Sequence, residues 1–152
     1  MSLITDAMQA QVGLETAPYK MRAEADDMVR FARMLGYTEP WYVDEVEARR
    51  SRFGGIIAAP TYLIVMRRLE HEAFASLNVG PPLPKGVDGG SAWQYFHAIR
   101  AGDVVTATAR VAGFKQRPTA LGETLFQTIE IDYRNQFGQL AVSQLDTRIY
   151  YQ

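Results

Sequence analysis

The stretch "FGGIIAAPTYLIVM", residues 53–66, decides the fold of this chain. Proline has a fixed φ and no backbone N–H, so it suits the first position of a helix. We therefore predict a long helix that begins at Pro60 and runs over residues 60–77. Its first turns, "TYLIVM", are apolar on every side, whereas charged residues follow only later. A helix that is apolar all round must be buried, so other elements have to wrap around its first half.

The sequence after this helix changes from helical to alternating periodicity. Residues 78–90, "NVGPPLPKGVDGG", hold three Pro and four Gly and are predicted to form a long loop. Beyond the loop, stretches rich in Val, Ile, Thr, Tyr and Phe are separated by the turn-forming clusters "RAGD", "KQRPTALG" and "QFGQ". This pattern predicts a meander of four successive antiparallel strands over residues 91–99, 104–114, 123–135 and 140–150.

The N-terminal part is predicted to be mainly helical. Residues 3–8 follow helical spacing, and a short strand over residues 18–22 could join the sheet. Residues 25–35 predict a longer helix, because their apolar positions repeat at helical spacing and Gly36 follows as a stop. Helices followed by strands predict one α+β domain over residues 1–152, in which a curved antiparallel sheet surrounds the apolar helix.

Composition and charge exclude several classes of function. The chain has 152 residues, of which 16 are Lys or Arg and 17 are Asp or Glu, so its net charge of -1 makes nucleic acid an unexpected partner. It has no Cys, which excludes disulfides, thiolate nucleophiles and Cys-ligated zinc. The N-terminus lacks a basic leader segment, and the longest apolar run is short and interrupted by Pro60. We therefore expect a soluble, cytoplasmic protein without membrane insertion.

The order of the motifs resembles the MaoC-like hydratase and dehydratase family over nearly the whole chain. The segments that carry the likeness are "GYTEPWYVD" (36–44), "SRFGGIIAAPTYL" (51–63), "FHAIRAGDVVTATARV" (96–111) and "YRNQFGQLAVSQ" (133–144). The resemblance implies the hot-dog fold, in which an antiparallel sheet wraps around a long central helix. Active members of the family add water to an acyl thioester or remove it, which implies a place in fatty acid metabolism.

The residues of the first segment depart from those of active family members, in which the loop looks like Gly-Asp-x-Asn-Pro-x-His-x-Asp. In the same spacing, Tyr37 stands where the catalytic Asp would be and Tyr42 stands where the His would be. An unperturbed phenol titrates near 10, so it is a poor base at neutral pH. Pro60 also takes the position of a Gly whose amide polarises the thioester, and proline has no N–H to donate. We therefore predict no catalytic residue in this chain.

These departures resemble the non-catalytic N-terminal repeat of two-repeat MaoC-like enzymes, in which the other repeat carries the Asp and His. Some members of the family split the repeats into two chains that associate. The resemblance thus implies an accessory subunit of an (R)-3-hydroxyacyl dehydratase or enoyl-thioester hydratase, in a heterodimer or larger assembly with a catalytic MaoC-like chain. It implies no cofactor, and an acyl-CoA or acyl-carrier thioester as the ligand.

The resemblance also implies a set of residues that bind the acyl group. The loop and the start of the predicted central helix would form the wall of an acyl tunnel. For the two aromatic residues of the loop, the alternative is that they fill a corner beside the helix over residues 25–35. The predicted substrate-binding residues are Trp41, Tyr42, Ala59, Pro60, Thr61 and Tyr62.

Two carboxylates near the loop are weak candidates for a catalytic base. Glu39 or Asp44 would need burial or a charged partner to act in this way. Carboxylates beside a turn are more often solvated or cap a helix. Asp44 with Glu47 three residues later indicates the start of a helix, so we predict a capping role for it.

The remaining polar candidates have ordinary structural interpretations. We predict His97 to be a hydrogen-bonded residue of a strand and His71 to lie on the surface, and their spacing does not support a metal site. Lys115 and Arg117 are predicted to be solvated turn residues. The alternative is that they contact the phosphates of a coenzyme A or carrier-protein arm.

Two other functions stay open. One is a homodimeric acyl-CoA-binding protein without catalysis, since hot-dog domains commonly pair their edge strands into one continuous sheet. The other is an active hydratase or thioesterase that uses unrecognised residues, because a fold alone does not determine an activity.

Overall fold

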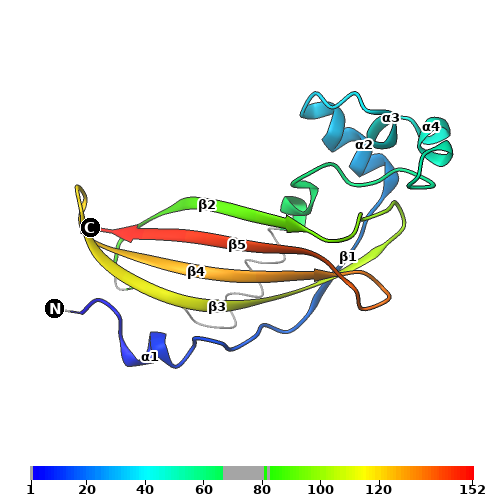
Figure 1. Ribbon diagram of the computed structural model, residues 1–152. Coiled ribbons are helices and arrows are strands. Elements are labelled where there is room, and N and C mark those ends of the chain that lie inside the picture. Colours follow the sequence, from blue (N-terminus) through cyan, green and yellow to red (C-terminus); the bar gives the residue numbers. More distant parts are fainter. Residues whose placement is uncertain (1, 67–80, 82) are drawn as a thin grey trace.

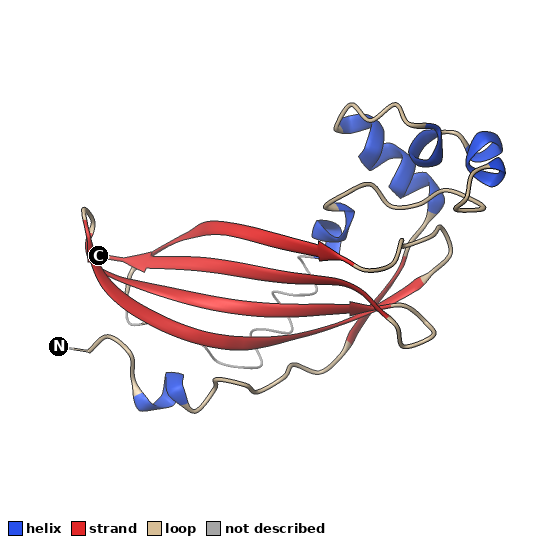
Figure 2. Ribbon diagram, in the orientation of Figure 1, coloured by secondary structure: helices blue, strands red, loops and turns tan. Residues whose placement is uncertain are grey.

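The computed structural model describes residues 2–66, 81 and 83–152, and five strands in this part of the chain form one antiparallel sheet in the order β1-β3-β4-β5-β2 (Figure 1). The four long strands curve together, and the helical segment over residues 25–50 gathers at one end of the sheet (Figures 1 and 2). The predicted α+β class with a curved antiparallel sheet is confirmed. The strands are β1 (Tyr19–Arg22), β2 (Lys85–Tyr95), β3 (Val104–Thr119), β4 (Gly122–Arg134) and β5 (Leu140–Tyr151).

The pairing of β2 differs from the prediction. β3, β4 and β5 form the expected meander, but β2 pairs with β5 and not with its successor β3, so it lies at the edge of the sheet. It also begins at Lys85, inside the predicted loop, and ends at Tyr95, before residue 99. Two of the glycines that suggested a loop allow β2 to pair with β5. A Cβ on Gly89 would lie 2.8 Å from the Ile149 side chain, so only glycine lets the strands approach closely there. Gly90 has a φ of 122° and lies at a β-bulge.

The hairpin between β3 and β4 is longer than predicted. β3 continues to Thr119 through most of the cluster "KQRPTALG", so Lys115 and Arg117 are strand residues and not turn residues. The guanidinium carbon of Arg117 lies 4.3 Å from the centroid of the Phe126 ring. Pro118 is tolerated because β1 pairs with β3 only over residues 104–107, which leaves the far end of β3 as an edge.

The predicted start of the central helix at Pro60 is wrong, because Pro60 and Thr61 form a turn in which Thr61 has a φ of 67°. The short 3-10 helix η1 (Tyr62–Met66) follows this turn, and the rest of the predicted helix, residues 67–77 with His71, lies outside the described residues. Three side chains of η1 are buried in one core with residues of β3, β4 and β5, as its apolar sequence required. The prediction that the first turns are buried on every side is wrong for Ile64 and Val65, which are 42% and 45% exposed in the isolated chain. The core side chains include Tyr62, Leu63, Met66, Val105, Ala107, Ala109, Ile129, Ile131, Tyr133 and Val142.

The other helices lie before η1 in the sequence. The short N-terminal helix α1 (Asp6–Gln9) starts three residues later than predicted, because Thr5 caps it. The predicted helix over residues 25–35 is confirmed as α2 (Ala25–Met34), and Gly36 follows with a φ of 82°. The one-turn helix α3 (Pro40–Val43) and the helix α4 (Glu45–Arg50) complete the cluster at the end of the sheet. Within the described ranges, none of the helices has the length and apolar character that a membrane crossing needs.

Candidate functional site

The loop after α2 forms an aromatic cluster. The ring centroids of Tyr37 and Tyr42 are 5.1 Å apart, and the indole of Trp41 lies 6.1 Å from the Tyr42 ring and 6.0 Å from the Phe53 ring. The carbonyl of Trp41 accepts a hydrogen bond of 3.0 Å from the Ile57 N–H, which ties the loop to the segment that leads into η1. Tyr37 and Tyr42, which stand where the resemblance implies an acid and a base, are thus packed against each other.

The two carboxylates near this cluster bond to the local backbone. Asp44 accepts hydrogen bonds from the N–H groups of Val46, at 2.9 Å, and Glu47, at 3.1 Å, so its predicted role as a helix cap is confirmed. Glu39 is exposed, and its carboxylate accepts a hydrogen bond of 3.2 Å from the Thr38 N–H. Neither carboxylate lines the cavity described next.

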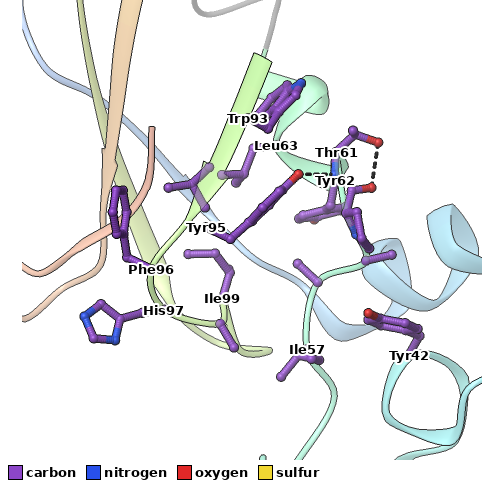
Figure 3. A pocket seen from close by; sticks show the side chains of 15 residues that line it. Tyr42, Ile57, Thr61, Tyr62, Leu63, Trp93, Tyr95, Phe96, His97 and Ile99 are labelled. Atoms are coloured by element: carbon purple, nitrogen blue, oxygen red, sulfur yellow. Dashed lines mark hydrogen bonds between the residues drawn. The ribbon is translucent and has the colours of Figure 1, made fainter. Parts of the chain in front are cut away.

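A cavity of about 250 Å³ opens between the segment before η1 and the end of β2 (Figure 3). Most of its lining is apolar or aromatic. A cavity of this kind suits a hydrocarbon group, because burial of each methylene contributes about 0.8 kcal/mol. Its lining comes from Tyr42, residues 57–63, Trp93, residues 95–99 and Val142.

The structure brings five of the six predicted substrate-binding residues together. Trp41 is not part of the cavity wall, and its indole instead packs against the Phe53 ring. Sequence reasoning did not assign the β2 side of the cavity, although the alternating aromatic residues at 93 and 95 were a signal for one face of a strand. The predicted residues in the wall are Tyr42, Ala59, Pro60, Thr61 and Tyr62.

The prediction that His97 lies in a strand is wrong. β2 ends at Tyr95, and His97 lies in the bend that follows, where its backbone N–H donates a 3.1 Å hydrogen bond to the Ala141 carbonyl. Its exposed ring stands on the side of the cavity opposite Tyr42 (Figure 3). The imidazole therefore does not meet the aromatic loop to form an acid–base pair.

Two phenols at the cavity are poor proton acceptors. Burial raises the pKa of Tyr62 to about 12, and the negative charges of Asp27 and Glu24 add to this effect. Burial also raises the pKa of Tyr95, against the opposing effect of the Thr61 N–H, which donates a 2.9 Å hydrogen bond to its hydroxyl oxygen. Both groups are protonated at neutral pH, so neither acts as a base there.

Metal chemistry has no support from the side chains that the structure describes. Among these residues, there is no group of three or more His, Asp or Glu side chains that could hold a metal ion.

Comparison with known proteins connects this geometry to a family. A family model described as "FAS1-like, dehydratase domain region" matches residues 10–144. Among curated relatives, a UPF0336 protein of Streptomyces griseus subsp. griseus is 29% identical over 116 residues, which cover 76% of this chain and 75% of that protein.

Solved structures show the same fold at low sequence identity. One is the C-terminally truncated HadBC (3R-hydroxyacyl-ACP dehydratase) complex of Mycobacterium tuberculosis, with a TM-score of 0.78 and 17% identity over 96% of this chain and 98% of that chain. Another is the ChsH1-ChsH2 complex of the same organism, with a TM-score of 0.64 and 14% identity over 93% of this chain and 98% of that chain. These likenesses confirm the hot-dog fold that the sequence resemblance implied.

Proposed function

From the membership of this chain in the family of the FAS1-like dehydratase domain region, we propose that it is an accessory subunit that binds an acyl thioester. The enzyme to which it belongs is a MaoC-like (R)-3-hydroxyacyl dehydratase or enoyl-thioester hydratase. A catalytic MaoC-like partner chain supplies the Asp and the His. The assembly is cytoplasmic and acts on acyl-CoA or acyl-carrier thioesters in fatty acid metabolism. This chain requires no cofactor of its own.

One observation carries the proposal: an apolar cavity lies beside a loop that has lost its acid–base pair. Water addition to an enoyl thioester needs a group that removes a proton from water and a group that returns one to the carbon chain. The packed phenols of Tyr37 and Tyr42 stand at these two positions, 5.1 Å apart between ring centroids. The cavity can still bury a hydrocarbon chain, so binding is retained where proton transfer is not.

The edge of the sheet supports association with a partner. β2 is an edge strand in the sheet of the described residues, and its side chains are largely exposed, with Val87 47% exposed and Tyr95 49% exposed. An unpaired edge is available for pairing with the strand of another chain. Two of the structures that share this fold are named as complexes, HadBC and ChsH1-ChsH2, which agrees with a partner for this chain.

The test compares the purified chain alone with a mixture of this chain and a catalytic MaoC-like chain from the same organism. Hydration of crotonyl-CoA and of longer enoyl-CoA substrates is followed, and light scattering coupled to size exclusion gives the mass of the species. We expect negligible turnover by this chain alone, and faster turnover or higher affinity for long substrates when a heteromeric species forms.

Two outcomes would contradict this function. Turnover by the chain alone that disappears in Glu39→Gln or Asp44→Asn would mean that a carboxylate had replaced the lost pair. A stable homodimer that binds acyl-CoA and does not associate with the catalytic chain would instead support a homodimeric binding protein, for which the same edge strand β2 is available.

A further inference from the structure

The side chain of Tyr95 crosses the cavity. It leaves the end of β2, and its ring lies between Ile99 and the segment before η1 (Figure 3). Its hydroxyl oxygen accepts a 2.9 Å hydrogen bond from the backbone N–H of Thr61. Both residues belong to the cavity wall, so this hydrogen bond joins two elements across the cavity.

The backbone around Thr61 directs this N–H toward the cavity. Thr61 has a φ of 67°, a left-handed conformation that is unusual for a β-branched residue and persists only when its surroundings hold it. Its own hydroxyl donates a 2.6 Å hydrogen bond to the Pro60 carbonyl, and the Tyr62 N–H donates a 3.0 Å hydrogen bond to the Ala59 carbonyl. These neighbouring groups are engaged within the turn, whereas the Thr61 N–H reaches out to a side chain on another element.

The Thr61 N–H is a donor in a mostly apolar wall, on the solvent-exposed side of the cavity, and the Tyr95 hydroxyl is its acceptor. The carbonyl oxygen of an acyl thioester is an acceptor of the right kind, but the Tyr95 hydroxyl already occupies this position. A ligand carbonyl would have to displace the phenol before it could bind there. A hydrocarbon chain requires no such exchange.

We propose that Tyr95 determines the specificity of the cavity: its hydroxyl caps the Thr61 amide, so that the cavity accepts the hydrocarbon part of an acyl ligand and excludes the thioester carbonyl. This inference rests on the proposed acyl-binding function. The thioester carbonyl of the ligand then binds to the partner chain, where the catalytic groups are expected, and the hydrocarbon tail of the ligand binds to this chain.

Two matched probes test the assignment. Octanoyl-pantetheine carries the thioester carbonyl, and the thioether S-octyl-pantetheine has the same chain length with a methylene in its place. Binding is measured in a Trp41→Phe background, in which Trp93, a residue of the cavity wall, is the remaining tryptophan and reports binding by its fluorescence. Circular dichroism confirms that each variant is folded.

With the native Tyr95, we expect both probes to bind with Kd values within about twofold of each other. Tyr95→Phe keeps the ring and removes the hydroxyl, so the Thr61 N–H becomes available. One additional hydrogen bond should then tighten binding of the thioester by roughly three- to tenfold and change binding of the thioether by less than about twofold. Tyr42→Phe is the matched control, because it removes another hydroxyl from the wall, and it should leave the ratio of the two Kd values unchanged.

Three results would overturn the assignment. A native chain that already prefers the thioester by about threefold or more would mean that Tyr95 does not cap the amide against a carbonyl. An unchanged ratio in Tyr95→Phe, with both probes still bound, would refute the role of Tyr95 and leave acyl binding intact. Failure of both probes to bind any variant would overturn acyl binding by this chain as well.

Discussion

Alanine at Gly89 is expected to destabilise the sheet through steric contact between β2 and β5. A Cβ at this position would lie 2.8 Å from Cγ1 and 2.9 Å from Cδ1 of Ile149, and 3.0 Å from the carbonyl oxygen of Thr147. The Ile149 side chain can rotate away, but the carbonyl belongs to the backbone of β5, with which β2 pairs. Gly89→Ala therefore requires β2 and β5 to move apart at the β-bulge.

The expected size of this effect follows from overpacking. An additional carbon in a packed site typically costs about 1–3 kcal/mol, and for a chain of this length each kcal/mol lowers Tm by roughly 2–4 °C. We expect Gly89→Ala to lower Tm by about 4–8 °C. Gly113→Ala is the matched control, because a Cβ there would meet nothing within 4 Å and the φ of Gly113 is outside the left-handed region. That variant should stay within about 0.5 kcal/mol of the native chain.

Thermal unfolding followed by far-UV circular dichroism gives both values, and urea unfolding followed by fluorescence gives the free energy independently. Trp93 lies on β2 near the altered pairing, so its emission should also change in Gly89→Ala before global unfolding. Equal Tm values for Gly89→Ala and Gly113→Ala would refute the reasoning. They would mean that the pairing of β2 with β5 can widen at no cost.

Two further predictions concern the site. Burial raises the pKa of Tyr62 from 10.0 to about 12, with smaller effects of Asp27 and Glu24, so its protonated form stabilises the fold fully below pH 10 and this contribution is lost as pH rises toward 12. Tyr62→Phe should therefore reduce the alkaline loss of unfolding free energy by roughly 2–3 kcal/mol. Urea unfolding measured across this pH range checks the prediction, and parallel pH profiles for the two proteins would contradict it. Asp44→Ala removes the cap of α4 and should lower the free energy of unfolding, measured in urea, by about 1 kcal/mol. Glu39→Ala removes an exposed carboxylate and should lower it by less than half as much. Equal decreases for the two variants would contradict the capping role.

The sequence predicted features that depend on neighbouring residues. The helix α2 follows from its apolar spacing and from Gly36, and the cap at Asp44 follows from the type and spacing of the first residues of α4. The meander of β3, β4 and β5 follows from alternation, since short connections favour pairing between successive strands. The presence of Tyr at positions 37 and 42 is read directly from the residues, whereas the catalytic meaning of these positions is an implication of the family resemblance.

The sequence did not predict features that depend on contacts between distant segments. Gly89 suggested a loop because glycine is frequent in loops, yet its role is to let β2 approach β5, some sixty residues further along the chain. Likewise, nothing near Tyr95 in the sequence indicates that its hydroxyl meets the Thr61 N–H across the cavity.

The sequence by itself therefore determined the class of fold, the elements with strong periodicity and the presence of Tyr at positions 37 and 42 of the loop. Only the tertiary structure decided that β2 pairs with β5, that Trp41 leaves the cavity wall and that Tyr95 caps a backbone amide within it. The physical reason is range: periodicity and capping act within a few residues, whereas strand pairing and cavity lining depend on which distant segments the folded chain brings into contact.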